Sequence, residues 1–230
     1  MAASNVLKEL EGFGTEQNRK VYSRHGVGEN QYGVSFGNLR ALGKQHLGDQ
    51  LLAEELWVTG NNDARVLATI IADPSIMTGK LIEDWRKGLD NYVITDAFTG
   101  LVARTKLSQK KAEKWTKAKA EWTSRAGFGL LAHLAMHDPA LPDEYFESHL
   151  EMIEQEIHSR RNRTRDAMNS ALIAIGVRNR NLQNKAIAAA KRIGKVDVDH
   201  GETGCGTPDA VDYILRTVEH QSQNKDDSST

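Results

Sequence analysis

Apolar side chains recur every three or four residues along most of the chain, which is the period of an amphipathic α-helix. The segment 49–60 shows the pattern with both of its boundaries. Asp49 is placed to cap the start of a helix, and Gly60 stands just past its end. One face is predicted to carry the apolar residues Leu51, Leu52, Leu56 and Trp57.

The same period predicts a succession of helices with short links and almost no strand. The helix in 61–74 is expected to be capped by Asn62 and to stop before Pro74. A Gly-rich segment, 194–210, separates the last two helices, and we expect Thr207 to cap the helix that follows it. The further predicted helices lie within 78–90, 91–105, 108–120, 122–139, 142–159, 163–179, 181–194 and 208–220.

This pattern predicts an all-α protein. Two very apolar helices end at Asp-Pro, before Pro74 and Pro139, which suggests helix pairs of about 35 to 45 residues stacked in series as an α-solenoid. A compact helical bundle would produce a similar pattern. We expect one repeat domain over 1–195, a Gly/Asp-rich loop and helix packed on it over 196–220, and a disordered tail over 221–230.

Charge is segregated along the chain although the formal net charge is only −1. Residues 104–125 hold eight Lys/Arg against two acids, and residues 160–195 hold ten against one. Between them, residues 138–156 hold seven acids and no Lys or Arg. The basic runs are either solvated helix faces or a surface for a polyanion, and the presence of two such runs favours the polyanion.

Composition narrows the cellular setting. A single cysteine, Cys205, excludes a disulfide within the chain and favours a reducing compartment. The N-terminal segment 1–14 is charged and amphipathic, without the apolar core of a signal peptide, and no stretch of eighteen apolar residues occurs. We therefore expect a cytoplasmic protein that is not inserted in a membrane.

The arginines at the start of the second basic run are candidate phosphate ligands. Four arginines within six residues at a helix N-terminus conflict with the helix dipole, and an external anion would relieve this conflict. The candidates are Arg160, Arg161, Arg163 and Arg165. Lys110 and Lys114, which recur with helical spacing in the first run, form either a second phosphate-binding strip or ordinary solubilising side chains.

Asp96 interrupts the apolar segment 91–98, where a carboxylate costs helix propensity and is expensive to bury. It would be explained by a helix that starts near Thr95, by a partner such as Arg104 or Arg65, or by a chemical role. His200 and Cys205 are weak metal candidates, because their spacing matches no common zinc pattern and no second thiolate is present. We expect no metal at these residues.

Five stretches, in order and at matching spacing, resemble the bacterial DNA alkylation repair glycosylases of the HEAT-like-repeat fold. They cover most of residues 33–193 and read YGVSFGNLRALGK, LWVTGNNDARVLATIIADP, DNYVITD, EWTSRAGFGLLAHLAMHD and RNRTRDAMNSALIAIGVRN. The resemblance implies a curved stack of helix pairs with a basic concave face that holds duplex DNA. It also implies hydrolysis of the N-glycosidic bond of cationic alkylpurines without a cofactor.

The resemblance assigns roles to three residues. Asp96 matches the catalytic aspartate, which would stabilise the oxocarbenium-like transition state. Arg125 matches an arginine that would bind phosphate near the lesion. Tyr92 stands where many members have Trp, one helical turn before Asp96. Ser170 departs from the pattern, because many active members carry a second Trp there.

The resemblance therefore implies a DNA glycosylase of the 3-methyladenine/7-methylguanine type, acting on cationic alkylated purines in duplex DNA. It is expected to act as a monomer, with no obligatory protein partner. The alternatives are a non-catalytic DNA-binding scaffold of the same fold, and a helical-repeat protein that binds an acidic protein partner. Release of free methylated base separates the first hypothesis from the other two.

Overall fold

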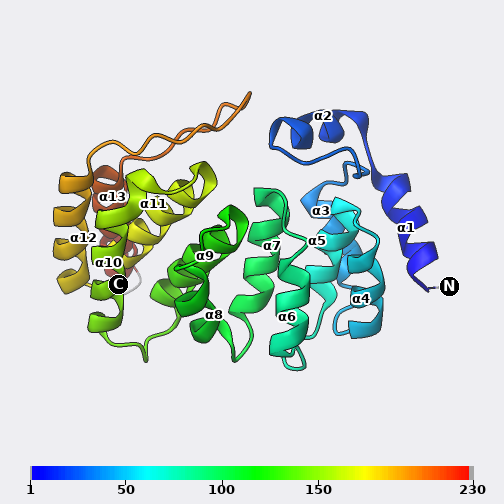
Figure 1. Cartoon of the computed structure of the whole chain (residues 1–230), viewed down its shortest axis with the longest axis horizontal. Helices are drawn as coiled ribbons and strands as arrows, with labels where there is room; N and C mark the ends of the chain where they lie inside the picture. The colour runs from blue at the N-terminus through cyan, green and yellow to red at the C-terminus, as the bar shows by residue number, and fades with distance from the viewer. Residues whose placement is uncertain (1, 228–230) are drawn as a thin grey trace. The chain divides into compact units, whose positions relative to one another are not determined.

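The computed structural model describes residues 2–227, with side chains from 3 to 223, and every regular element in that range is a helix (Figure 1). The expectation of an all-α protein is confirmed. The chain divides into two compact units. Unit 1 comprises residues 1–108 and 200–204, and unit 2 comprises 109–199 and 205–230. The predicted division into 1–195 and 196–220 stays a prediction.

Unit 1 contains seven of the described helices. They are α1 (Ala2–Phe13), α2 (Glu16–Arg24), α3 (Phe36–Gly43), α4 (Gln50–Val58), α5 (Asn62–Ile71), α6 (Gly79–Arg86) and α7 (Tyr92–Ala103). α5 packs against α3, α4 and α7. At the centre Trp57 and Trp85 stack in parallel, with ring centroids 4.3 Å apart, and Phe98 of α7 is fully buried beside Trp57. This core fixes α7, the helix that carries Asp96.

Unit 2 is built around a pair of long helices, α9 and α11. Its helices are α9 (Glu121–His137), α10 (Asp143–Glu156), the 3-10 turn η1 (Ile157–Ser159), α11 (Asn162–Gly176), α12 (Arg180–Ile193) and α13 (Ala210–Asp227). α11 also packs on α12 and α13. α8 (Ser108–Trp115) begins at the unit boundary. Gly127 of α9 allows close contact with the end of α8, because a Cβ there would lie 2.4 Å from the Thr116 nitrogen.

Local capping signals place the helix starts to within a residue or two. The Asp49 carboxylate accepts a hydrogen bond from the Leu52 nitrogen, and Gly60 has a φ of +72°, both as predicted. The cap of α5 is Asn61 rather than Asn62, since the Asn61 side chain accepts from the Ala64 nitrogen. At α13 the expected cap Thr207 is wrong as well. The Asp209 carboxylate accepts from the Asp212 nitrogen, and the helix begins at Ala210.

Other expectations for individual residues also needed correction. Leu51, expected on the apolar face of its helix, is 79% exposed. α13 continues through 221–227, where a disordered tail was expected, and residues 228–230 of that tail lie outside the described residues. No helix in the described part of the chain combines the length and apolar character needed to cross a membrane.

Candidate nucleic-acid interface

α7 begins at Tyr92 because Asn91 caps it from a buried position. The Asn91 side-chain oxygen accepts from the Ile94 nitrogen at 3.1 Å, and its amide donates to the Asn62 side chain at 3.2 Å. Asn91 is only 3% exposed. This capping fixes the start of α7, so Asp96 lies in the second turn of the helix rather than at a start near Thr95.

The Asp96 side chain is exposed on α7. The expectation of an expensive burial is therefore wrong, because Ile94, Thr95 and Phe98 supply the buried face of this helix and Asp96 lies on another side. The two arginines considered as partners donate hydrogen bonds to backbone carbonyl oxygens. Arg65 donates to the Trp57 and Gly88 carbonyls, and Arg104 to the Thr69 carbonyl. Asp96 is thus an exposed residue, one turn after Tyr92 on the same side of α7.

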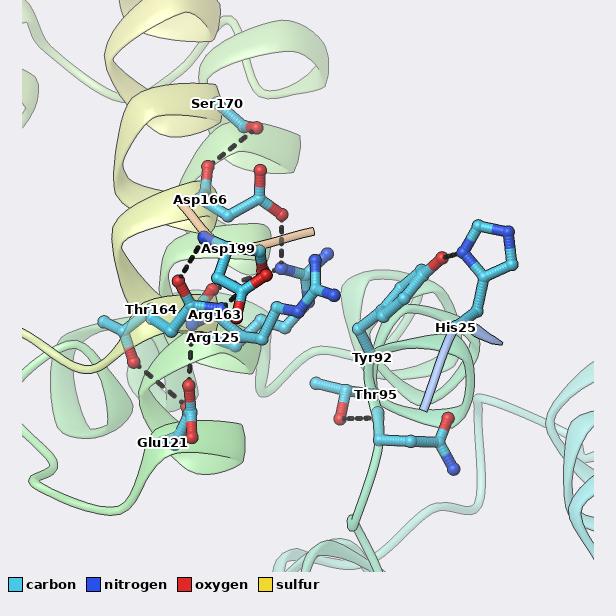
Figure 2. A network of polar contacts seen from close by, with 12 residues as sticks. His25, Tyr92, Thr95, Glu121, Arg125, Arg163, Thr164, Asp166, Ser170 and Asp199 are labelled. Atoms are coloured by element: carbon cyan, nitrogen blue, oxygen red, sulfur yellow. Dashed lines mark hydrogen bonds and ion pairs between the residues drawn. The ribbon is translucent and has the colours of Figure 1, made fainter. Parts of the chain in front are cut away.

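Tyr92 contacts a residue that sequence reasoning missed. Its hydroxyl forms a hydrogen bond with Nδ1 of His25, and the two rings meet edge to face with centroids 5.6 Å apart (Figure 2). His25 is the C-cap residue of α2. The two residues are 67 positions apart, so no local pattern in the sequence could have paired them.

A second missed residue, Asp63, organises the backbone that follows α2. Asp63 is 1% exposed, and its carboxylate accepts hydrogen bonds from three consecutive backbone nitrogens, those of Tyr32, Gly33 and Val34, at 2.6, 3.2 and 2.9 Å. Such charge-assisted bonds stabilise a buried carboxylate. Asp63 therefore holds the 32–34 segment against the start of α5.

In unit 2, the Arg125 side chain forms hydrogen bonds that link two helices. Its guanidinium donates to the Asp166 carboxylate at 2.7 Å and to the Arg163 carbonyl at 3.1 Å (Figure 2). The Arg125 side chain is only 10% exposed. These bonds join α9 to the first turns of α11, so the guanidinium that the resemblance assigns to phosphate is engaged with its own protein.

Arg160 is also used internally. Its guanidinium donates to the carbonyls of Thr116 and Ala118, which follow the end of α8, and to the Glu156 carboxylate. Its side chain is 15% exposed. Arg160 thus stabilises the link between α8 and α9 in this structure.

The conflict between arginines and the α11 dipole is relieved from within the protein. The Glu121 carboxylate accepts from the Arg163 backbone nitrogen at 2.6 Å, and the Thr164 hydroxyl donates to the Glu121 carbonyl (Figure 2). Glu121 thus occupies the position that was expected to hold an external anion. Of the four arginines, Arg161 is exposed, whereas Arg163 and Arg165 are partly exposed.

The lysines of α8 point in two directions. Lys110 and Lys114 are exposed, whereas Lys111 is buried with its ammonium 5.4 Å from the centre of the Trp115 ring. Ser170, at the position where the family pattern has an aromatic residue, is exposed on α11 and donates to the Asp166 carbonyl. The outward cations of unit 2 are therefore fewer than the basic runs of the sequence suggested.

The segment between α12 and α13 holds the weak metal candidates. Cys205 is exposed, and His200 is partly exposed. Among the described residues, no group of three or more His, Cys, Asp or Glu side chains is arranged to hold a metal ion.

Comparison with known proteins identifies the family. Residues 6–214 match the family described as DNA alkylation repair enzyme, and the chain belongs to that family. Two uncharacterized proteins are similar to it over 90% of this chain and 92% of their own length: Lin0241 of Listeria innocua at 29% identity, and Lmo0209 of Listeria monocytogenes at 27%.

A solved protein is similar in both sequence and structure. It comes from what is described as a new family of proteins related to the HEAT-like repeat DNA glycosylases with affinity for branched DNA structures. The TM-score is 0.88 at 30% identity, over 95% of this chain and 94% of that chain. The resemblance seen in the sequence is confirmed, and the fold is a HEAT-like repeat fold. The expected curvature and basic concave face stay predictions.

Proposed function

We propose that this protein binds DNA through its sugar–phosphate backbone and prefers branched DNA over linear duplex. The affinity for branched DNA described for the solved relative supports the ligand class. The observation in this chain that carries the proposal is the outward position of Arg161 at the start of α11, with Arg163 and Arg165 partly exposed beyond it. Contacts of this kind position a protein on DNA without reading bases.

The internal use of Arg125 and Arg160 supports a DNA-structure binder over a lesion-specific enzyme. Both guanidiniums are largely buried and bonded to carbonyl and carboxylate oxygens. Ser170 further offers a small hydroxyl where an aromatic ring would stack on a cationic base. The remaining outward cations suit recognition of backbone geometry, which is what distinguishes a branched DNA from a duplex.

A second candidate function is hydrolysis of the N-glycosidic bond of cationic alkylpurines in duplex DNA. The observation that favours it is the exposed Asp96 carboxylate, one turn after Tyr92 on α7. As a base leaves, positive charge develops on the deoxyribose, and a fixed carboxylate stabilises it and orients the attacking water. The base is already cationic, so no strong general acid is needed.

Binding is tested by fluorescence anisotropy with a four-way junction, a three-way junction, a duplex and a single strand built from the same sequences. The expected order of affinity is junctions first, then duplex, measured with unlabelled duplex as competitor. Equal affinity for junction and duplex would contradict the preference for branches, and absence of binding would contradict the whole proposal. Release of 3-methyladenine and 7-methylguanine from alkylated duplex tests the second candidate on the same preparation.

A further inference from the structure

Two histidines lie on one side of the last turns of α9. His133 and His137 are four residues apart in this helix, a spacing that places side chains next to each other on the helix surface. Their ring centroids are 4.5 Å apart, and the ring planes are tilted by 48°. The two imidazoles are therefore neighbours in space as well as along the helix.

Neither ring belongs to the core of unit 2. The buried side of this part of α9 is supplied by Leu130, Leu131 and Leu134, whereas His133 is partly exposed and His137 is exposed. In the part of the chain that the structure describes, neither imidazole is hydrogen-bonded to another residue. Because a neutral imidazole has one nitrogen with a lone pair, the two rings offer two nitrogen donors to a ligand.

The backbone beneath the two rings is fixed by the bonds that end α9. The Asp138 nitrogen donates to the Leu134 carbonyl at 3.0 Å. The Arg178 guanidinium donates to the carbonyls of Ala135 and Asp138 at 2.8 and 2.7 Å. These bonds hold the turn that joins the two histidines, so the spacing of their side chains is set before a ligand binds.

The separation of the rings fits one class of metal ion. An imidazole nitrogen binds a transition metal at about 2.0 Å, which places the ring centre about 3.2 Å from the ion. Two rings at a right angle about one ion then have centres about 4.5 Å apart, whereas two rings at the tetrahedral angle have centres about 5.2 Å apart. The observed 4.5 Å matches the right angle, which copper(II) and nickel(II) favour, rather than the tetrahedral angle typical of zinc(II).

A hollow of about 770 Å³ opens beside His137 within unit 2. Met136 and Pro139 line it together with His137, and Met136 is 61% exposed. An ion held by two imidazoles keeps further coordination positions for water or for a second ligand. The hollow gives such a ligand access to the side of α9 on which His137 lies.

We propose that His133 and His137 form a two-imidazole site for a divalent transition metal, with copper(II) bound more tightly than nickel(II) or zinc(II). The order follows from the affinity series of these ions for nitrogen donors and from the ring separation. Because both donors come from one helix, the bound ion closes a chelate across the last turns of α9. The inference does not rest on DNA binding.

The first arm of the test measures metal binding by isothermal titration calorimetry with copper(II), supplied as its glycine complex, and with nickel(II) and zinc(II). Every protein carries Cys205→Ser, because the exposed thiol would itself bind and reduce copper. We expect His137→Gln to weaken copper binding at least about tenfold, since the second donor of a chelate acts at high effective concentration. The matched control, His158→Gln, removes an exposed histidine of unit 2 outside the pair and should leave the affinity unchanged.

The second arm identifies the donors. The electron paramagnetic resonance spectrum with one equivalent of copper(II) should show hyperfine splitting from two imidazole nitrogens in the parent protein. We expect both His133→Gln and His137→Gln to lose that pattern. His137 is exposed, so its variant should fold as the parent does, and circular dichroism checks this.

Several results would overturn the inference. Copper affinity unchanged in His137→Gln would do so, and an equal loss in His158→Gln would show scattered surface binding instead of a site. Zinc(II) bound more tightly than copper(II) would contradict the role of the ring separation, and a parent spectrum without two imidazole nitrogens would contradict the chelate. The proposal on branched DNA is tested separately, because its measurement contains no transition metal.

Discussion

Arg125, near the start of α9, donates a hydrogen bond of 2.7 Å to Asp166, near the start of α11. The same guanidinium nitrogen bonds the Arg163 carbonyl, so one side chain links two helices at two points. The arrangement turns an arginine that the sequence suggests as a phosphate ligand into part of the framework of unit 2.

Loss of Asp166 should therefore reduce stability before it changes DNA binding. Asp166→Asn leaves the 10% exposed Arg125 side chain without its carboxylate, which should lower the free energy of unfolding by about 2 kcal/mol. Urea denaturation measures the loss, and Asp197→Asn serves as an exposed control in the same unit. Unchanged stability together with lost DNA affinity would argue that Arg125 contacts phosphate after all.

Asp63 is expected to be among the most sensitive carboxylates in unit 1. Asp63→Asn keeps the shape but places an amide donor against three backbone N–H donors, at a cost of about 3 kcal/mol. Hydrogen exchange at Tyr32, Gly33 and Val34 should accelerate. Asp49→Asn is the control, because an N-cap asparagine replaces aspartate with little loss. Equal losses of unfolding free energy in the two variants would mean that accepting three hydrogen bonds makes Asp63 no more important for stability than the N-cap Asp49.

Asp96→Asn should leave stability unchanged, since the side chain is exposed. If the protein releases alkylated bases, removing this charge should slow release about a hundredfold, the usual worth of one preorganised group opposite developing charge. Glu55→Gln, an exposed carboxylate of unit 1, is the control. Release at the wild-type rate from Asp96→Asn would exclude a catalytic role for this residue. If neither the wild type nor any variant releases base, binding of branched DNA is the proposed function that remains.

DNA affinity should depend on salt in proportion to the phosphates contacted. For about five contacts the log–log slope is about −4 to −5, and Arg161→Ala with Arg165→Ala should flatten it by about one unit for each lost contact. Arg192→Ala with Lys195→Ala removes the same charge from two exposed cations elsewhere in unit 2. If both pairs change the slope equally, the effect is one of net charge rather than of contacts at the start of α11.

Stability should fall as the solution becomes acidic. Burial lowers the pKa of His149, which is 7% exposed, and burial with His137 nearby lowers the pKa of His133. The unfolded chain therefore binds protons first, so stability is complete above the ordinary pKa of 6.5 and is lost as the pH falls below it. Urea denaturation at several pH values should show a smaller loss for His149→Gln than for the wild type, with the exposed His158→Gln as control. An equal loss in His149→Gln would mean that other groups carry the pH dependence.

From residue 49 onward, helix positions in this protein follow from local chemistry, and the sequence alone determines them closely. Asp49 and Asn91 cap helices through side-chain bonds to nitrogens three residues ahead, and Gly60 supplies the positive φ that ends α4. The errors at Asn62 and Thr207 amount to one or two residues, because a neighbouring Asn or Asp makes the same bond equally well. The family, too, was recognisable from the sequence, since its motifs lie in order along the helices.

The role of each charge was decided only by the tertiary structure. Arg160 and Arg161 are neighbours in sequence, yet one is bonded inside unit 2 and the other faces outward, because the carbonyls that hold Arg160 come from a turn more than forty residues away. His25 and Asp63 gave no local signal, since their partners are 67 and about 30 residues distant. The hydrogen-bond partner of a polar side chain depends on which distant backbone groups the packed helices bring near it. Local sequence patterns do not show these neighbours, whereas the folded structure does.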